Sequence, residues 1–261
     1  MVANIKRLTA YHALFATWVA RDIRVRYKQS LLGIAWAILQ PLAATLILAL
    51  VFTRIVPLPT GDGPHLVFYY SGMLAWTFFA AALSFGIGSL VSNMHLVTKV
   101  YFPREIIPLA SVAAGLVDFA IAASILAGLV LVYRAPVTPA IALVPIALVI
   151  QVAFTTALVL AGSALNVFYR DVRFVVPLAT QLLFFLTPVI YPVSFVPEAW
   201  RSVYLLNPMA VVIEIYRAAV GAVPAPPPAP SIALSIGTAL ALLAAGYATF
   251  KRVEPDMADM I

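Results

Sequence analysis

The sequence predicts an all-helical protein that crosses a membrane about six times. Of its 261 residues, 64% are hydrophobic and only 10% are charged, whereas soluble domains carry about 25% charged residues. Apolar stretches that reach the roughly 20 residues needed for a spanning helix recur along the chain. The net charge of +6 is therefore better explained by membrane topology than by nucleic-acid binding, and no nucleic-acid partner is expected.

The first segment, residues 5–29, is predicted to form an amphipathic helix in the membrane interface. Leu8, Tyr11, Phe15 and Trp18 recur at spacings of three and four, with basic residues around them. The segment lacks a small-x-small cleavage site and runs straight into further charged residues, so we expect it to be retained rather than cleaved as a signal peptide. A membrane anchor and a docking surface for a cytoplasmic partner are both compatible with such a helix.

Six apolar stretches within a single membrane domain, residues 1–261, are predicted to be transmembrane helices. Charged or turn-rich segments separate them. Their expected bounds are 31–53, 66–91, 109–132, 139–166, 174–191 and 231–250. Between the last two, residues 198–222 carry charges, and their apolar runs are too short to cross. This segment is predicted to form external re-entrant or interfacial helices.

The basic residues set the predicted orientation of these spans. With both termini in the cytoplasm, twelve of the sixteen Lys and Arg residues lie on that side, six before the first span and six in later segments, whereas the opposite orientation leaves four there. Because cytoplasmic flanks hold an excess of Lys and Arg, we expect a multi-pass protein of the inner (plasma) membrane with cytoplasmic termini. Residues 192–230 are then external.

The chain lacks the residues that ATP hydrolysis requires. A phosphate-binding loop contains Gly-Lys followed by Ser or Thr, but none of Lys6, Lys28, Lys99 and Lys251 follows a glycine. There is no cysteine for a thiolate metal site, no paired histidine motif and no Gly-x-Ser-x-Gly element. These absences disfavour an enzyme, and we expect no cofactor or metal to be bound by this chain.

Asp118 is the one acidic residue deep inside a predicted span. An ionisable residue at that depth is a functional-site hypothesis. It is interpreted either as a buried hydrogen-bonding partner between helices or as a proton relay. A relay usually needs a chain of such groups, which favours the first interpretation.

Four sequence blocks, found in order between the spans, resemble the polysaccharide export permeases of type-2 ABC transporters. They read RDIRVRYKQSLLGIAWAILQP at 21–41, LVTKVYFPREIIP at 96–108, NVFYRDVR at 166–173 and FLTPVIYP at 185–192. The resemblance implies a homodimer paired with cytoplasmic nucleotide-binding ATPase subunits, which bind the ATP and Mg. It further implies export of a lipid-linked polysaccharide, such as O-antigen, capsule or teichoic acid, from the cytoplasm to the outer face of the inner membrane.

The resemblance also implies where the ATPase is contacted: on the amphipathic helix and on the loop between the second and third spans. The matching residues here are Arg21, Asp22, Arg24, Arg26, Tyr27, Lys99, Phe102, Pro103, Arg104 and Glu105. ATP-driven closure of the partner would push on these two elements and shift spans one and five around a central channel. The external helices, at residues 203–217, would then shape the channel exit.

A channel for a sugar polymer is expected to be lined by aromatic rings, because rings pack on the apolar faces of sugars. The candidates are Trp36, Phe78, Phe79, Phe184, Phe185 and Tyr191. Each is equally compatible with a lipid-facing position or an interfacial belt. In the last span, Gly237, Ala241 and Ala245 place a small residue at every fourth position, which permits close approach of another helix.

Three alternatives stay open. A type-2 ABC permease for a drug or small lipid shares this architecture without the polymer. A secondary transporter needs coupling-ion residues at mid-membrane and usually internal repeats, of which the sequence offers only Asp118. A membrane-bound glycolipid enzyme would turn over its substrate without ATP or a partner subunit.

Overall fold

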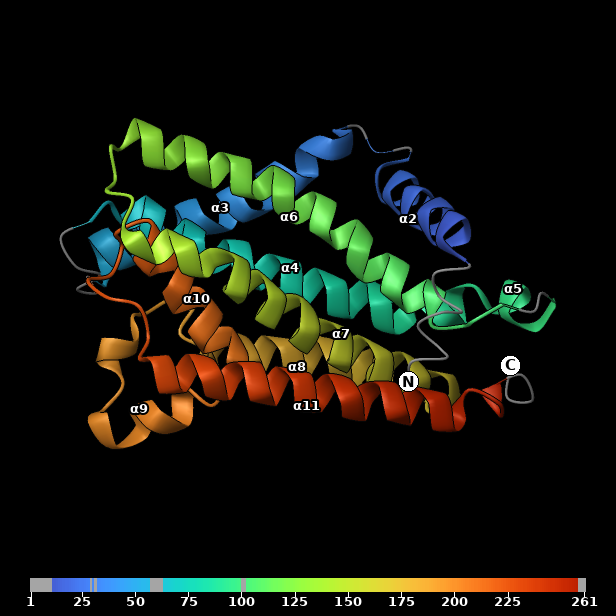
Figure 1. Ribbon diagram of the computed structural model, residues 1–261. Coiled ribbons are helices and arrows are strands. Elements are labelled where there is room, and N and C mark those ends of the chain that lie inside the picture. Colours follow the sequence, from blue (N-terminus) through green and yellow to red (C-terminus); the bar gives the residue numbers. More distant parts are fainter. Residues whose placement is uncertain (1–10, 29, 31, 57–62, 100–101, 258–261) are drawn as a thin grey trace.

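The computed structural model describes residues 11–28, 30, 32–56, 63–99 and 102–257, and all regular structure in these ranges is helical. The helices are α2 (His12–Tyr27), η1 (Gly33–Ala35), α3 (Trp36–Leu50), the π-helical turn η2 (Val51–Ile55), α4 (His65–Ser92), α5 (Met94–Lys99), α6 (Ile106–Val132), η3 (Pro139–Leu143), α7 (Val144–Phe168), α8 (Val172–Leu186), η4 (Val193–Phe195), α9 (Glu198–Tyr204), α10 (Pro208–Ala219) and α11 (Ala229–Val253). Figure 1 shows an elongated bundle with α2, α5 and the last turns of α11 at one end.

Five helical segments in the described part of the chain are long and apolar enough to cross a membrane. They are Trp36–Ile55, His65–Ser92, Ile106–Val132, Pro139–Phe168 and Ala229–Val253. Each overlaps one of the predicted spans. The prediction of an all-helical chain with several apolar membrane helices is therefore confirmed for the described residues.

The segment predicted as the fifth span differs from the others. α8 has 15 residues and ends at Leu186, so the predicted end at Tyr191 is wrong by five residues. Pro188 is the physical reason, because the residue before a proline is driven towards extended backbone, and Thr187 has φ −100° and ψ 139°. Fifteen residues rise about 22 Å, less than the roughly 30 Å of hydrocarbon in a bilayer. α8 alone is therefore too short for a full crossing.

α4 is the central helix of the bundle. It packs against α3, α6, α7, α8 and α10, and most of its residues are buried. The amide of Gln151 on α7 donates to the Ala75 carbonyl of α4 at 2.9 Å and accepts from the Tyr216 hydroxyl of α10 at 2.8 Å. Because an unpaired polar group in hydrocarbon costs several kcal/mol, this shared amide fixes the register of three helices.

The region 198–222 contains two short helices with opposite environments. No residue of α9 is buried, whereas all twelve residues of α10 are buried. α10 packs against α4, α7 and α11. The side chain of Asn207 starts this helix by accepting from the Met209 amide at 3.0 Å, as N-capping residues do. α10 therefore belongs to the core of the bundle.

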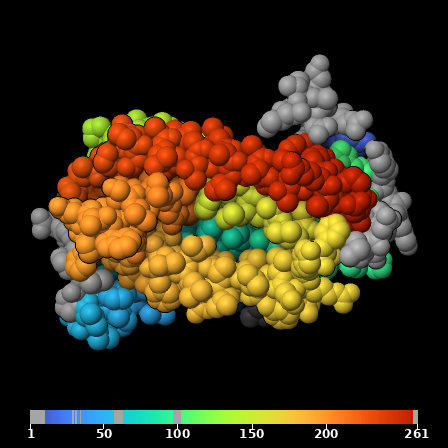
Figure 2. Space-filling model, turned by 90° about the horizontal axis from the view of Figure 1, so that it is seen from below, coloured from blue at the N-terminus to red at the C-terminus, as the bar shows by residue number. Residues whose placement is uncertain are grey.

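α8 is the least covered of the apolar helices in the described structure. None of its residues is buried, although it contacts α4 and α7. Its large exposed side chains are Phe174, Val175, Leu178, Leu182, Phe185 and Leu186. In Figure 2, part of α4 (teal) is visible at the bottom of a hollow between α8 (yellow to gold) and α11 (red). A contiguous apolar face of this kind needs lipid or another protein surface beside it.

α11 lies along α7, and the glycine at position 246 makes their close approach possible. A Cβ atom at Gly246 would overlap the carbonyl oxygen of Ala157. The repeat of Gly237, Ala241 and Ala245 lies on the exposed side of α11, and a Cβ at Gly237 would meet nothing within 4 Å. That repeat is therefore not used to pack helices inside the subunit.

We expect Gly246→Leu to destabilise the subunit by about 1–3 kcal/mol, because an inserted side chain overpacks a close helix contact. The measurement is the thermal denaturation midpoint of the purified protein in detergent. Gly237→Leu is the matched control on the same helix and should leave the midpoint unchanged. Equal midpoints for the two variants would contradict the α7–α11 contact.

Candidate functional site

Trp18 anchors α2 to the rest of the bundle. Its side chain is 7% exposed and its ring lies 6.4 Å from that of Phe102, centroid to centroid. Leu90, Ile106 and Phe250 belong to the same hydrophobic cluster. One packed layer therefore joins α2 to the loop before α6 and to the end of α11, which is the end of the bundle where sequence reasoning places the ATPase contacts.

The outer side of α2 carries two of the predicted coupling arginines. Arg21 donates to the Asn93 side chain at 2.7 Å, and its guanidinium lies 4.5 Å from the centre of the Trp18 ring. Arg24 is exposed, and its side chain donates to the carbonyl of Ala20, within its own helix, at 3.1 Å. Arg21, with 42% of its side chain exposed, and Arg24 thus present positive charge outward.

Asp22 lies beside these arginines in a more buried position. Burial raises the pKa of its carboxyl group above the ordinary value, while the positive charges of Arg21 and Arg26 act in the opposite direction. Its nearest ion-pair atom is a guanidinium nitrogen of Arg21 at 3.8 Å. The burial of Asp22 leaves the exposed surface of α2 predominantly basic.

Arg26 and Tyr27 turn into the bundle and hold Asp118 of α6. An Arg26 guanidinium nitrogen lies 2.6 Å from Asp118 Oδ2, and the Tyr27 hydroxyl donates to Asp118 Oδ1 at 2.5 Å. The other terminal nitrogen of Arg26 donates to the Ser111 carbonyl at 2.9 Å. The guanidinium also lies 4.4 Å from the centre of the Phe85 ring. Asp118 is thus placed as a polar partner between two helices.

The environment of this cluster favours a neutral tyrosine. Burial and the hydrogen bond to Asp118 raise the pKa of the Tyr27 hydroxyl above its ordinary value, so it remains a donor. The Arg26 side chain is 8% exposed and that of Asp118 is 24% exposed. Separating such a pair would leave a charge in a poorly hydrated position, which is costly. The cluster therefore attaches α2 firmly to α6.

The loop before α6 is attached to the end of α11 by a second charged cluster. Lys251 Nζ lies 2.7 Å from Glu105 Oε1 and 2.8 Å from Glu254 Oε2. The Arg104 amide donates to Glu254 Oε1 at 3.3 Å, and its guanidinium donates to the main-chain oxygen of Glu254. Arg104 and Glu105 are thus engaged within the subunit, and the Glu105 side chain is only 2% exposed.

The remaining coupling candidates lie in the same loop. Phe102 is buried against Trp18, and Pro103 is partly buried beside it. Lys99 ends α5, but its side chain lies outside the described residues. Lys251 and Glu254 were missed by sequence reasoning, although a Lys and a Glu three residues apart after the last apolar span are a readable signal of an ion pair.

The aromatic channel candidates do not share one surface within the subunit. Phe78 and Phe79 are buried, and Phe79 stacks on Phe154 with ring centroids 5.7 Å apart. Trp36 on α3 and Phe185 on α8 are exposed by 51% and 58%. The ring of Phe184 lies 5.5 Å from that of Trp76, centroid to centroid. The Tyr191 hydroxyl donates a hydrogen bond to the Phe185 carbonyl at 2.9 Å.

A groove of about 440 Å³ between α4 and α8 combines aromatic rings with neutral polar groups. Its described lining contains no charged side chain and consists of Trp76, Ala80, Ser84, Val176, Pro177, Thr180, Gln181, Phe184 and Phe185. Rings that stack on sugars, together with hydroxyl and amide groups, form the kind of surface on which carbohydrate binds. Trp76 and Gln181 were not among the predicted channel residues, because periodicity does not reveal which helices enclose a groove.

Arg217 of α10 holds the irregular turn that follows α8. One guanidinium nitrogen donates to the carbonyls of Pro188 at 2.7 Å and Tyr191 at 3.1 Å, and lies 3.2 Å from Glu214 Oε1. The other donates to the Val189 carbonyl at 2.6 Å. The side chain is fully buried. Sequence reasoning placed Arg217 at the channel exit but missed this structural role.

Together, a bundle of apolar helices, a basic layer at one end and a groove lined by aromatic and neutral polar groups define a membrane transport subunit. The chain belongs to the ABC-2 type transporter family, whose family model matches residues 13–220. The resemblance to polysaccharide export permeases of type-2 ABC transporters is confirmed by individual relatives.

Three relatives illustrate this similarity. Over the full length of both chains, the protein is 31% identical to the O-antigen export system permease protein RfbA of Myxococcus xanthus. It is 30% identical, over 76% of each chain, to the protein of the same name from Klebsiella pneumoniae. Identity to the polysialic acid transport protein KpsM of Escherichia coli is 26%, over 77% of this chain and 78% of that protein.

We expect Arg26→Met and Asp118→Leu each to destabilise the protein by about 3 kcal/mol, because each leaves the other charge without its partner. The double variant should lose clearly less than the sum of the two single losses. Thermal denaturation in detergent of the wild type, the two single variants and the double variant measures this coupling. Tyr27→Phe serves as a milder comparison, with an expected loss of about 1 kcal/mol. Strictly additive losses would show that the two charges do not interact.

Proposed function

We propose that this chain is the membrane subunit of an ABC exporter that moves a lipid-linked polysaccharide of the O-antigen type from the cytoplasm to the outer face of the inner membrane. The observation that carries the proposal is the similarity to an O-antigen export permease over the full length of both chains. In this proposal the chain works as a homodimer with two cytoplasmic ATPase subunits, which bind ATP and Mg.

The arrangement of charge supports the proposed orientation. α2, the loop before α6 and the end of α11 lie at one end of the bundle (Figure 1) and together carry Arg21, Arg24, Arg26, Arg104, Lys251 and Arg252. Because cytoplasmic flanks hold an excess of Lys and Arg, this basic end supports the proposal that it lies in the cytoplasm. Arg21 and Arg24 then face the compartment in which an ATPase partner is found.

The two charged clusters suggest how work is transmitted. In this proposal, a displacement of α2 by the ATPase moves α6 through the Arg26–Asp118 ion pair. A displacement of the loop before α6 moves α11 through the Glu105–Lys251 ion pair. Exposed Arg24, rather than inward-facing Arg26, is the proposed contact with the ATPase. The exposed start of α3, at Trp36, and the exposed face of α8 are the proposed walls of the channel between two subunits, with the groove beside α8 as a sugar-binding surface.

The first test is purification from native membranes together with a candidate ATPase from a neighbouring gene. The expected result is a complex of two copies of each subunit with vanadate-sensitive ATP hydrolysis. A chain that purifies and transports alone would overturn the proposal. Deletion of the gene should cause the lipid-linked polymer to accumulate inside the cell, whereas a permease for a drug or small lipid would leave the polymer's location unchanged.

We expect Arg24→Glu to weaken the ATPase partner's binding about tenfold, equivalent to about 1.4 kcal/mol, because the exposed charge on α2 is reversed. Polymer export should fall with it. Arg24→Lys keeps the charge at the same position and is the matched control. Titration of the detergent-purified subunit with the ATPase measures the effect. Unchanged binding by Arg24→Glu would remove this part of α2 from the interface.

We expect Gln181→Leu to slow polymer export about fivefold, the equivalent of one lost hydrogen bond of about 1 kcal/mol. The neighbouring Leu182→Met preserves the apolar character of α8 and is the control. Complex formation and ATP hydrolysis should be unchanged in both variants, so the readout is polymer at the cell surface. Normal export by Gln181→Leu would show that the groove does not carry the polymer.

A further inference from the structure

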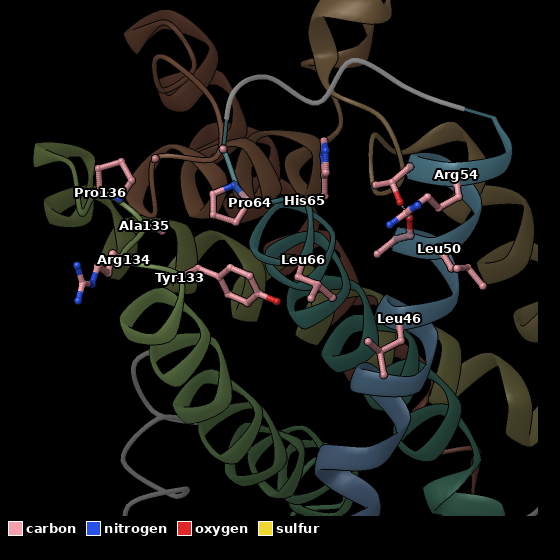
Figure 3. A pocket seen from close by; sticks show the side chains of 14 residues that line it. Leu46, Leu50, Arg54, Pro64, His65, Leu66, Tyr133, Arg134, Ala135 and Pro136 are labelled. Carbon is pink, nitrogen blue, oxygen red and sulfur yellow. Dashed lines mark hydrogen bonds between the residues drawn. The ribbon is translucent and has the colours of Figure 1, made fainter.

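At the end of the bundle away from α2, a cleft of about 910 Å³ opens between α3, α4 and α6. Figure 3 shows its residues coming from the last turns of α3 and η2, the start of α4 and the end of α6. The region has no part in the proposed coupling or in the groove beside α8. It therefore calls for its own explanation.

The cleft is amphipathic. Leu46 and Leu50 of α3 form one wall and Leu66 of α4 lies opposite, while Arg54 follows one turn beyond Leu50, as Figure 3 shows. Arg134 adds a second positive charge at the edge of the cleft. No acidic side chain occurs among its described lining residues. The surface thus changes from aliphatic to cationic along the direction of α3.

Both arginines are exposed, and neither side chain forms a hydrogen bond or ion pair within the described part of the structure. Arg54 lies in the π-helical turn Val51–Ile55, where the Val56 amide bonds to the Val51 carbonyl at 2.9 Å. One extra residue in a turn rotates the following side chains by about 100° relative to an uninterrupted α-helix. π-helical turns are rare in proteins, and those that do occur are often found at functional sites. Arg54 therefore has an unusual backbone setting as well as an available charge.

We propose that this cleft binds an anionic phospholipid of the membrane leaflet at this end of the bundle, with an acyl chain along Leu46, Leu50 and Leu66 and the phosphate at Arg54. A guanidinium pairs well with phosphate oxygens, and basic pockets between membrane helices bind anionic lipid headgroups. Leu46 and Leu50 are 55% and 60% exposed, so the aliphatic wall is open to a lipid tail. The proposal goes beyond polymer export and does not depend on it.

The experiment uses the full-length chain, with any co-purifying subunit, in nanodiscs of phosphatidylcholine that contain a minor share of phosphatidylglycerol. Phosphatidylglycerol retained per subunit after delipidation is measured by native mass spectrometry. We expect selective retention by the wild type and about fivefold less by Arg54→Gln, since one basic residue near the membrane surface contributes about that factor to anionic lipid binding. Arg54→Gln with Arg134→Gln should lower retention further, and Arg54→Lys should restore part of it.

The matched control is Arg170→Gln, which removes an exposed arginine near the α2 end and should retain as much phosphatidylglycerol as the wild type. Equal retention by Arg54→Gln and the wild type would overturn the proposal, as would an equal loss in Arg170→Gln. Displacement of the bound lipid by an equimolar polyprenyl diphosphate would assign the cleft to a carrier lipid instead. A change of oligomeric state in Arg54→Gln with unaltered lipid retention would assign it to a second copy of the chain.

Discussion

The backbone of a chain in a membrane must find its hydrogen-bond partners within the protein, because hydrocarbon offers none. This constraint is most severe after α8, where the helix ends at Leu186, just before Pro188, and leaves the carbonyl groups of the following turn without helical donors. Arg217 supplies the donors and reaches three of these carbonyls. Its burial requires α10 to lie inside the bundle and α4 to leave space at Gly72, where a Cβ would lie 2.9 Å from an Arg217 nitrogen. The positions of α4, α8 and α10 follow from this one side chain.

Hydropathy was sufficient to predict the helical character of the chain and the approximate positions of the long apolar helices, because a spanning helix must be apolar over about 20 residues. It failed at α8, where a continuous apolar run concealed the break at Pro188. The sequence contained the relevant signal, the dipeptide Thr187-Pro188, but the length of the apolar run suggested a longer helix. The end of α8 is therefore set by the backbone restriction before Pro188 and not by the length of the apolar run.

The site was less predictable than the fold, because contacts between distant segments leave no trace in periodicity. Asp118 was recognised as unusual, yet nothing in the sequence identifies Arg26 as its partner 92 positions earlier. Similarly, Arg24 and Arg26 belong to one motif, but residues two apart on a helix point to different sides. The structure divides the motif into an outward-facing charge on Arg24 and an inward-facing one on Arg26. Only the three-dimensional arrangement shows that Arg24 is exposed, whereas Arg26 attaches α2 to α6.

The lack of buried residues on α8 affects how the protein tolerates change over evolution. A helix whose side chains contribute little to the packed core places few demands on its sequence, so substitutions there are only weakly restrained by folding. Selection on α8 can then act mainly on the molecules that contact its exposed surface. Substitutions on α4 and α10 remain restrained by the buried side chains of these two helices. In related permeases, substitutions are therefore expected to be tolerated more often on α8 than on α4 and α10.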